Sequence, residues 1–214
     1  TRSILEVMLK FRQPCALITK STMIERDLDI LSEMAKLNLV SAAVSVTSMS
    51  NELKRALEPR TAAPAARLRT IKTLADAGVP VGVMFAPVIP FVNDSDMEAV
   101  LEAAAQAGAS SAGYVFLRLP HELSPLFREW LDVHHPQRAA HVMSLVQQSR
   151  GGKDYNADFS TRMRGQGEVA EMIEQRFRLA CKRFGLNQGG RWSRGLETGL
   201  FKVPAKTGDQ MGLF

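Results

Sequence analysis

Short apolar runs alternate with segments of helical periodicity over the first 120 residues, and this alternation constrains the fold most. The apolar runs lie at 15–19, 40–47, 79–89 and 111–119. The run at 79–89 is almost continuously apolar, which is typical of a strand buried on both faces. Each of the first three runs precedes a helical pattern, so the spacing fits parallel βα units. We predict an α/β fold with about four parallel strands, as an open sheet or as part of a barrel.

Local signals place the predicted helices. The stretches 22–25 and 95–98 have the spacing of capping boxes, in which side chains satisfy free N–H groups at a helix start. Pro64 suits a first helical turn, because the N–H that it lacks has no partner there. Gly78 ends that helix, since glycine takes a left-handed conformation without strain.

The strand signal ends at Pro120 and helical patterns follow. The last 28 positions hold six glycines and little periodicity. We therefore expect three parts: a partial barrel at 1–120, a helical extension at 121–186, and a glycine-rich, partly ordered tail at 187–214.

Composition narrows the class of protein. Hydrophobic residues make up 45% of the 214 residues and charged residues 23%, as in an ordinary globular protein. The sequence lacks a run of 18 apolar residues and a signal-peptide pattern at its start, so we expect no membrane span and a cytoplasmic location. The opening stretch, 1–6, reads like the middle of a helix, and we expect the true N-terminus upstream.

The residues that metals and nucleophilic enzymes use are sparse. The two cysteines, Cys15 and Cys181, are too far apart in sequence for a close-spaced metal motif. The four histidines form no zinc-binding spacing. The sequence also lacks a P-loop, a dinucleotide-binding glycine motif and a Ser-His-Asp order, so those chemistries have no support.

Polar residues end several of the apolar runs. Ligands bind at the carboxyl ends of parallel strands. The positions that this rule nominates are Thr19, Lys20, Ser21, Ser45, Thr47, Ser48, Ala86, Pro87, Pro90, Arg118 and Pro120. Lys20 could neutralise a carboxylate or a phosphate, and the two hydroxyls face the same side of one strand. The alternatives are a solvated lysine and two packing residues with satisfied hydroxyls. A turn with an exposed ion pair would equally explain Glu58-Pro59-Arg60.

The ordered set of motifs is more specific than any one of them. Along the chain the set reads Ile18-Thr19-Lys20-Ser21, Arg26-Asp27-Leu28-Asp29, Val44-Ser45-Val46-Thr47, Leu57-Glu58-Pro59-Arg60, Arg67-Leu68, Ala77-Gly78-Val79-Pro80-Val81, Ala86-Pro87-Val88-Ile89-Pro90, Asn93-Asp94, Gly113-Tyr114-Val115, Arg118-Leu119-Pro120, Arg150-Gly151-Gly152-Lys153 and Arg176-Phe177. This set resembles the radical SAM superfamily, in its spore-photoproduct-lyase-like branch, often labelled "DNA repair photolyase".

The resemblance implies part of a (β/α)6 barrel that works with a [4Fe-4S] cluster and S-adenosylmethionine (SAM). The cluster cleaves SAM to a 5′-deoxyadenosyl radical that takes hydrogen from the substrate, and DNA or a nucleotide is the substrate that the branch suggests. The positions that the resemblance places near SAM are Lys20, Ser45, Thr47, Arg60, Pro87 and Ile89.

One departure from the family pattern is decisive. Radical SAM proteins hold the cluster with C-x-x-x-C-x-x-C, and this sequence has no such motif. We therefore expect the C-terminal portion of a longer enzyme, with no metal site of its own and inactive alone. Because uncovered strand edges invite association, we expect this chain to self-associate.

Two further interpretations remain open. A non-enzymatic scaffold could bind nucleic acid through Arg176, Arg178, Lys182 and Arg183. A metal-free enzyme could use Lys20 covalently.

The last residues suggest a partner of their own. Gln210, Met211, Leu213 and Phe214 resemble the Gln-Leu-x-Leu-Phe peptide of proteins that bind the bacterial replication sliding clamp. The alternative is a frayed terminus.

Overall fold

A single parallel sheet forms the centre of the computed structural model, which describes residues 1–189 and 195–204. Its strands are β1 (Cys15–Thr19), β2 (Val40–Ser45), β3 (Val81–Val88) and β4 (Ser111–Phe116). They lie in the order β1-β2-β3-β4, and each pairs in parallel with the next. The prediction of four parallel strands in an α/β fold is confirmed.

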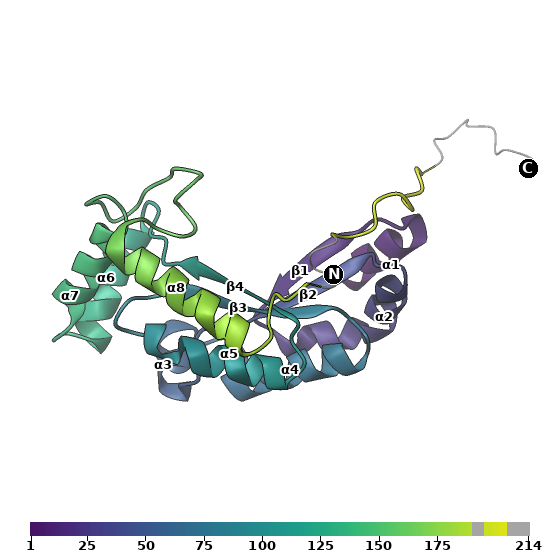
Figure 1. Ribbon diagram of the computed structural model, residues 1–214, viewed down its shortest axis with the longest axis horizontal. Helices are drawn as coiled ribbons and strands as arrows, with labels where there is room; N and C mark the ends of the chain where they lie inside the picture. Colours follow the sequence, from purple (N-terminus) through teal and green to yellow (C-terminus); the bar gives the residue numbers. More distant parts are fainter. Residues whose placement is uncertain (190–194, 205–214) are drawn as a thin grey trace, which may run out of the picture.

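Helices connect the strands and extend beyond the last one (Figure 1). Between the strands lie η1 (Thr22–Asp27), α2 (Leu28–Lys36), α3 (Asn51–Leu57), α4 (Pro64–Asp76), η2 (Asp94–Asp96) and α5 (Met97–Gln106). The chain begins with α1 (Arg2–Phe11), and α6 (Leu123–His134), α7 (Ala139–Gln148) and α8 (Gly167–Arg183) follow β4. In Figure 1, α6 and α7 lie at one end of the molecule and α1 and α2 at the other. None of the helices in the described ranges is long and apolar enough to cross a membrane.

Both predicted capping boxes are wrong, although the helices near them exist. The Ser21 hydroxyl accepts a hydrogen bond from the Met23 N–H at 3.1 Å and begins the 3-10 helix η1, so α2 starts only at Leu28. Asp96, not Ser95, is the N-cap residue of α5, and it makes no side-chain cap bond. Neither α2 nor α5 begins with a side-chain cap bond, so the spacing of the sequence misplaced both helix starts.

One face of the sheet packs against α2, α4 and α5. Val44 and Val83 lie opposite each other in the β2–β3 register, and Phe85 follows on the same face. All three side chains are fully buried, as are Ile71 of α4 and Val100 of α5. Because successive strand residues point to opposite faces, this pattern fixes which residues point away from the helices.

The opposite face carries small side chains. Ala43 of β2 pairs with Gly82 of β3, and Gly82 pairs with Ser111 of β4. On β1 the same face presents Ile18, which is 69% exposed. The strands of this face approach so closely that a Cβ on Gly82 would meet the Ser111 Oγ at 2.2 Å and its carbonyl oxygen at 3.0 Å.

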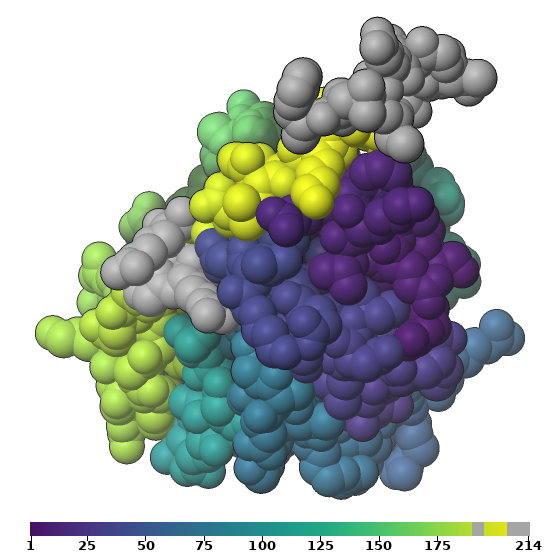
Figure 2. Space-filling model, turned by 90° about the vertical axis from the view of Figure 1, so that its right-hand side faces the viewer, coloured from purple at the N-terminus to yellow at the C-terminus, as the bar shows by residue number. Residues whose placement is uncertain are grey.

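The segment 195–204 returns to the start of the chain. The Lys202 N–H donates to the Phe11 carbonyl at 2.8 Å, and the Glu197 N–H donates to the Asn38 carbonyl at 2.9 Å. Figure 2 shows this yellow segment lying on the purple and blue surface of the N-terminal elements. The remaining tail positions, 190–194 and 205–214, lie outside the described residues, and the three-part division of the chain stays a prediction.

Gly82→Ala should destabilise the fold by about 2 kcal/mol, because the new methyl group meets the backbone of Ser111, which cannot rotate away. Gly113→Ala is the matched control: its Cβ would meet the end of the flexible Met84 side chain, at 2.6 Å from Sδ. Urea unfolding followed by circular dichroism measures both. Equal losses for the two variants would contradict this account of the close approach.

Candidate functional site

The carboxyl ends of β1 and β2 meet around one carboxylate. Lys20 follows β1 directly, and its ammonium forms an ion pair with Glu58 Oε1. The Thr47 hydroxyl, just beyond β2, lies 3.0 Å from the same oxygen and 3.3 Å from the Ala86 carbonyl at the end of β3. Glu58, the residue that ends α3, therefore joins loops that follow different strands.

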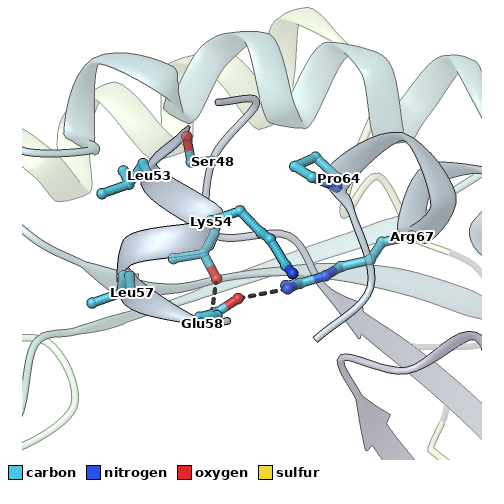
Figure 3. A pocket seen from close by; sticks show the side chains of 8 residues that line it. Ser48, Leu53, Lys54, Leu57, Glu58, Pro64 and Arg67 are labelled. Carbon is cyan, nitrogen blue, oxygen red and sulfur yellow. Dashed lines mark hydrogen bonds and ion pairs between the residues drawn. The ribbon is translucent and has the colours of Figure 1, made fainter. Parts of the chain in front are cut away.

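Arg67 of α4 holds the other side of this carboxylate (Figure 3). Its Nη2 lies 2.6 Å from Glu58 Oε2, its Nη1 donates to the Ser45 carbonyl at 2.9 Å, and its Nε donates to the Ala62 carbonyl at 2.8 Å. Arg67 is only 1% exposed. A buried guanidinium is costly unless it is paired, and these contacts satisfy it.

The charge of Glu58 is stabilised by its two cations. Burial by itself would raise the pKa of this carboxyl. Hydrogen bonds and Coulomb attraction from Lys20 and Arg67 outweigh burial and hold the pKa below its ordinary value of 4.5. Glu58 is therefore an anion at neutral pH, and it orients the Lys20 ammonium.

Asn93 fixes the same edge from the β3 side. Its side chain is fully buried, its Nδ2 donates to the Thr47 and Pro87 carbonyls at 2.8 and 2.9 Å, and its Oδ1 accepts from the Ile89 N–H at 2.7 Å. One amide thus uses both of its donors and its acceptor to join the ends of β2 and β3.

Ser45 is the predicted binding residue whose hydroxyl remains free to bind a ligand. Only 4% of it is exposed, and its hydroxyl has no hydrogen-bond partner within residues 1–189 and 195–204. It ends β2 on the small-residue face, in register with Met84. The site therefore offers a free hydroxyl and a partly exposed ammonium to a polar or anionic ligand.

The other predicted site residues lie in different settings. Arg60 is exposed, and the expected ion pair in Glu58-Pro59-Arg60 is not the one formed, because Glu58 pairs with Lys20 and Arg67 instead. Pro87 is half-buried beyond a cis peptide bond, and Ile89 is fully buried beside Asn93.

The described residues do not fit a [4Fe-4S] cluster. They contain no group of three His, Cys, Asp or Glu residues that could hold a metal. Cys15 begins β1 at the opposite end of the strand from Lys20, and Cys181 lies on α8. Burial raises the pKa of Cys15, and it raises that of Cys181 to about 11, whereas iron ligation requires thiolates.

Sequence reasoning did not assign a role to Glu58 or Arg67, but one signal was present. Arg67, Ile71 and Leu74 have the spacing of an apolar helix face, and all three are buried. A cation within such a stripe requires a buried anion or several carbonyls. The sequence did not show that this anion is Glu58, because Glu58 meets Arg67 only through the position at which α3 ends.

The structure describes the predicted basic helix but not the predicted clamp-binding peptide. Arg176 is engaged with Asp94 and Glu98, so it does not contribute a free charge to the proposed basic helix. Arg178, Lys182 and Arg183 are exposed. The clamp-like peptide, Gln210 to Phe214, lies outside the described residues.

A parallel sheet with polar groups at the carboxyl ends of its strands is an arrangement in which α/β proteins bind ligands, and comparison with known families finds a similar region. The model of the radical SAM superfamily matches residues 2–104. Over that region, which is just under half of the 214 residues, the chain is similar to this superfamily.

Individual relatives cover the chain only in part. An uncharacterised protein of Mycobacterium tuberculosis is 35% identical over 134 residues, which are 62% of this chain and 39% of the relative. An uncharacterised protein of Acidianus two-tailed virus is 31% identical over 127 residues, which are 57% of this chain and 40% of that protein. The match thus spans about two fifths of the length of these relatives.

Solved structures of spore photoproduct lyase share the fold. The enzyme in complex with a dinucleoside spore photoproduct superposes with a TM-score of 0.62 at 17% identity, over 87% of this chain and 54% of that one. A cysteine-to-alanine mutant of the same enzyme gives 0.56 at 15% identity over the same shares. The four-stranded sheet therefore has the fold of part of the spore photoproduct lyase structure.

Glu58→Gln should destabilise the protein by about 3 kcal/mol at pH 7, because buried Arg67 loses its anion. The pKa of Glu58 is lower in the folded state, so its contribution is complete above about pH 4.5 and is lost as the pH falls through the folded-state pKa. The difference from the wild type should therefore shrink in acid. Urea unfolding between pH 3 and pH 7 measures it.

Glu33→Gln is the matched control for this prediction. Glu33 forms an exposed pair with Lys36, three residues along α2, so its loss should cost less than about 0.5 kcal/mol. A Glu58→Gln variant as stable as Glu33→Gln at pH 7 would show that the buried pair does not hold the edge together.

Proposed function

We propose that this chain supplies the SAM-binding edge of a radical SAM enzyme. The observation that carries the proposal is the contact of Lys20 and Thr47 with Glu58, and of the Ser45 carbonyl with Arg67, at the carboxyl ends of strands in a region that matches the family. In this family a [4Fe-4S] cluster supplies the electron that cleaves SAM to a 5′-deoxyadenosyl radical. With two distant cysteines in 214 residues, we propose that the cluster ligands belong to a longer form of the protein.

Named side chains fit the polar groups of SAM. The Lys20 ammonium is oriented by Glu58 and partly exposed, so it suits the carboxylate of the methionine moiety. The free Ser45 hydroxyl suits the amino or carboxylate group beside it. Thr47 is already committed to Glu58 and Ala86, and we assign it to positioning. Pro87 and Ile89 would border the adenine, and exposed Arg60 would lie at the rim.

The substrate is a separate part of the proposal. The similar fold of spore photoproduct lyase is known in complex with a dinucleoside photoproduct, which supports a nucleotide or DNA substrate and a lyase-like reaction. We propose that the enzyme is located in the cytoplasm. Binding of the sliding clamp through Gln210 to Phe214 and self-association of the chain stay predictions.

The experiment that tests the proposal compares this chain with a longer form from its gene. Both are reconstituted anaerobically with iron and sulfide, reduced, and assayed for 5′-deoxyadenosine. The longer form should show a cluster absorbance and release the nucleoside, and this chain should show neither. A longer form without either property would refute the proposal.

Lys20→Met in the longer form should weaken SAM binding about tenfold, because it removes a charged partner of the carboxylate. Equilibrium dialysis with labelled SAM measures the binding without turnover. The control is Lys72→Met, which removes an exposed lysine paired with Asp76 on α4. Equal affinities of the two variants would move SAM away from the end of β1.

A further inference from the structure

Three arginines gather beyond β4 without a carboxylate. Arg118 follows the strand, and Arg150 and Arg162 come from the segment after α7. The side chains of Arg2, Arg26, Arg67, Arg128 and Arg176 make the arginine–carboxylate ion pairs within residues 1–189 and 195–204. We call Arg118, Arg150 and Arg162 the arginine cluster.

Arg150 is the buried centre of this cluster. It is 1% exposed, and its two terminal nitrogens donate to carbonyls alone: Leu117 at 2.7 Å, Arg162 at 2.9 Å, Thr161 at 3.1 Å and Phe116 at 3.3 Å. These bonds attach the 161–162 loop to the end of β4. Burial first, and then the nearby charge of Arg118, lower the pKa of Arg150.

Each arginine of the cluster has an unused donor. The Nε atoms of Arg118, Arg150 and Arg162 are buried and have no hydrogen-bond partner. Unpaired buried donors are costly, and like charges that lie close together add to this cost. An anion with several oxygens would offset the positive charge through the exposed parts of the half-buried Arg118 and Arg162, although it would not reach the buried Nε atoms.

Aromatic rings alternate with these cations. The Arg118 Nη2 donates to the Tyr155 hydroxyl at 3.2 Å, and the Arg162 guanidinium lies 4.4 Å from the centre of the Phe159 ring. Phe159 is 81% exposed. Arginines that meet phosphates beside rings that stack on bases are the pattern of proteins that bind single-stranded nucleic acid.

The arginine cluster lies at the same sheet edge as the SAM residues. The Leu117 N–H donates to the Val88 carbonyl at 2.9 Å, which places Arg118 beside the end of β3. The end of β3 is joined to Thr47 through Ala86 and Asn93. A ligand bound to the arginine cluster would therefore lie beside the part of the sheet edge where we propose that SAM binds.

We propose that the arginine cluster, through Arg118 and Arg162, binds the phosphate group of a nucleotide or of a nucleic-acid strand. Phosphate is favoured over carboxylate because its tetrahedral oxygens can meet several guanidinium groups at once, whereas a carboxylate matches one planar fork. This inference deepens the proposed function and rests on it in one respect: only if the protein is such an enzyme does the bound phosphate belong to a substrate.

The test measures binding by this chain at several salt concentrations, with fluorescent oligothymidylate as the probe. Inorganic phosphate and a thymidine dinucleotide serve as competitors. Arg118→Gln and Arg162→Gln should each weaken oligothymidylate binding about tenfold and lower the slope of log K against log salt by about one. Arg69→Gln, an exposed arginine of α4 with the same charge change, should leave both unchanged.

Arg118→Lys separates charge from geometry, and it keeps the test valid if Arg118→Gln fails to fold. Lysine retains the charge but loses the planar fork, so its affinity should lie between those of the wild type and Arg162→Gln. Thermal unfolding by circular dichroism checks that each variant is folded.

The competitors identify the source of the phosphate. A dinucleotide that competes far better than inorganic phosphate supports a nucleic-acid strand, and equal competition supports a free phosphate group. Binding that is insensitive to both arginines, or displaced by polyglutamate but not by phosphate, would overturn the proposal. The binding test needs neither an iron–sulfur cluster nor SAM. If this chain binds phosphate but the longer form releases no 5′-deoxyadenosine, the proposed function is refuted and the phosphate site is not.

Discussion

The carboxylate of Glu58 is shared by Lys20, Thr47 and Arg67, and the edge of the sheet depends on this shared contact. The three partners come from the ends of β1 and β2 and from α4. Without this anion Arg67 would be an unpaired buried charge, which is among the costliest defects in a protein. The Lys20 ammonium would also lose the partner that orients it. The same carboxylate therefore stabilises the fold and orients the lysine.

Positive charge is distributed unevenly along this edge. At β1 and β2 the two cations Lys20 and Arg67 share the one negative charge of Glu58, so a ligand there meets a hydroxyl and an oriented ammonium whose charge is only partly compensated. Beyond β4 the arginine cluster has carbonyls, a hydroxyl and rings as partners, so its charge is not compensated by a carboxylate. A ligand that spans the edge would therefore meet one half in which a carboxylate partly compensates the positive charge and another half in which no carboxylate does.

The parallel sheet could be predicted because its signals are local. Apolar runs such as 79–89 and breakers such as Pro64 and Gly78 depend on neighbours in sequence. The lack of a side-chain cap on α5 could not be predicted, since the Asp96 carboxylate accepts hydrogen bonds from Ser48 and Met49, which are distant in sequence. The absence of a cluster motif was also readable from sequence, because three closely spaced cysteines are a local pattern.

The sequence by itself determined the α/β class, the strand order along the chain and the nomination of Lys20, Ser45 and Thr47 at strand ends. Only the tertiary structure decided which residues hold them, because Glu58, Arg67 and Asn93 meet those strand ends from other segments of the chain. It also decided that Arg118 and the carbonyl of Arg162 lie near Arg150. Ion pairs and buried donors join residues that are distant in sequence, so their partners are fixed by how the chain packs and not by local spacing.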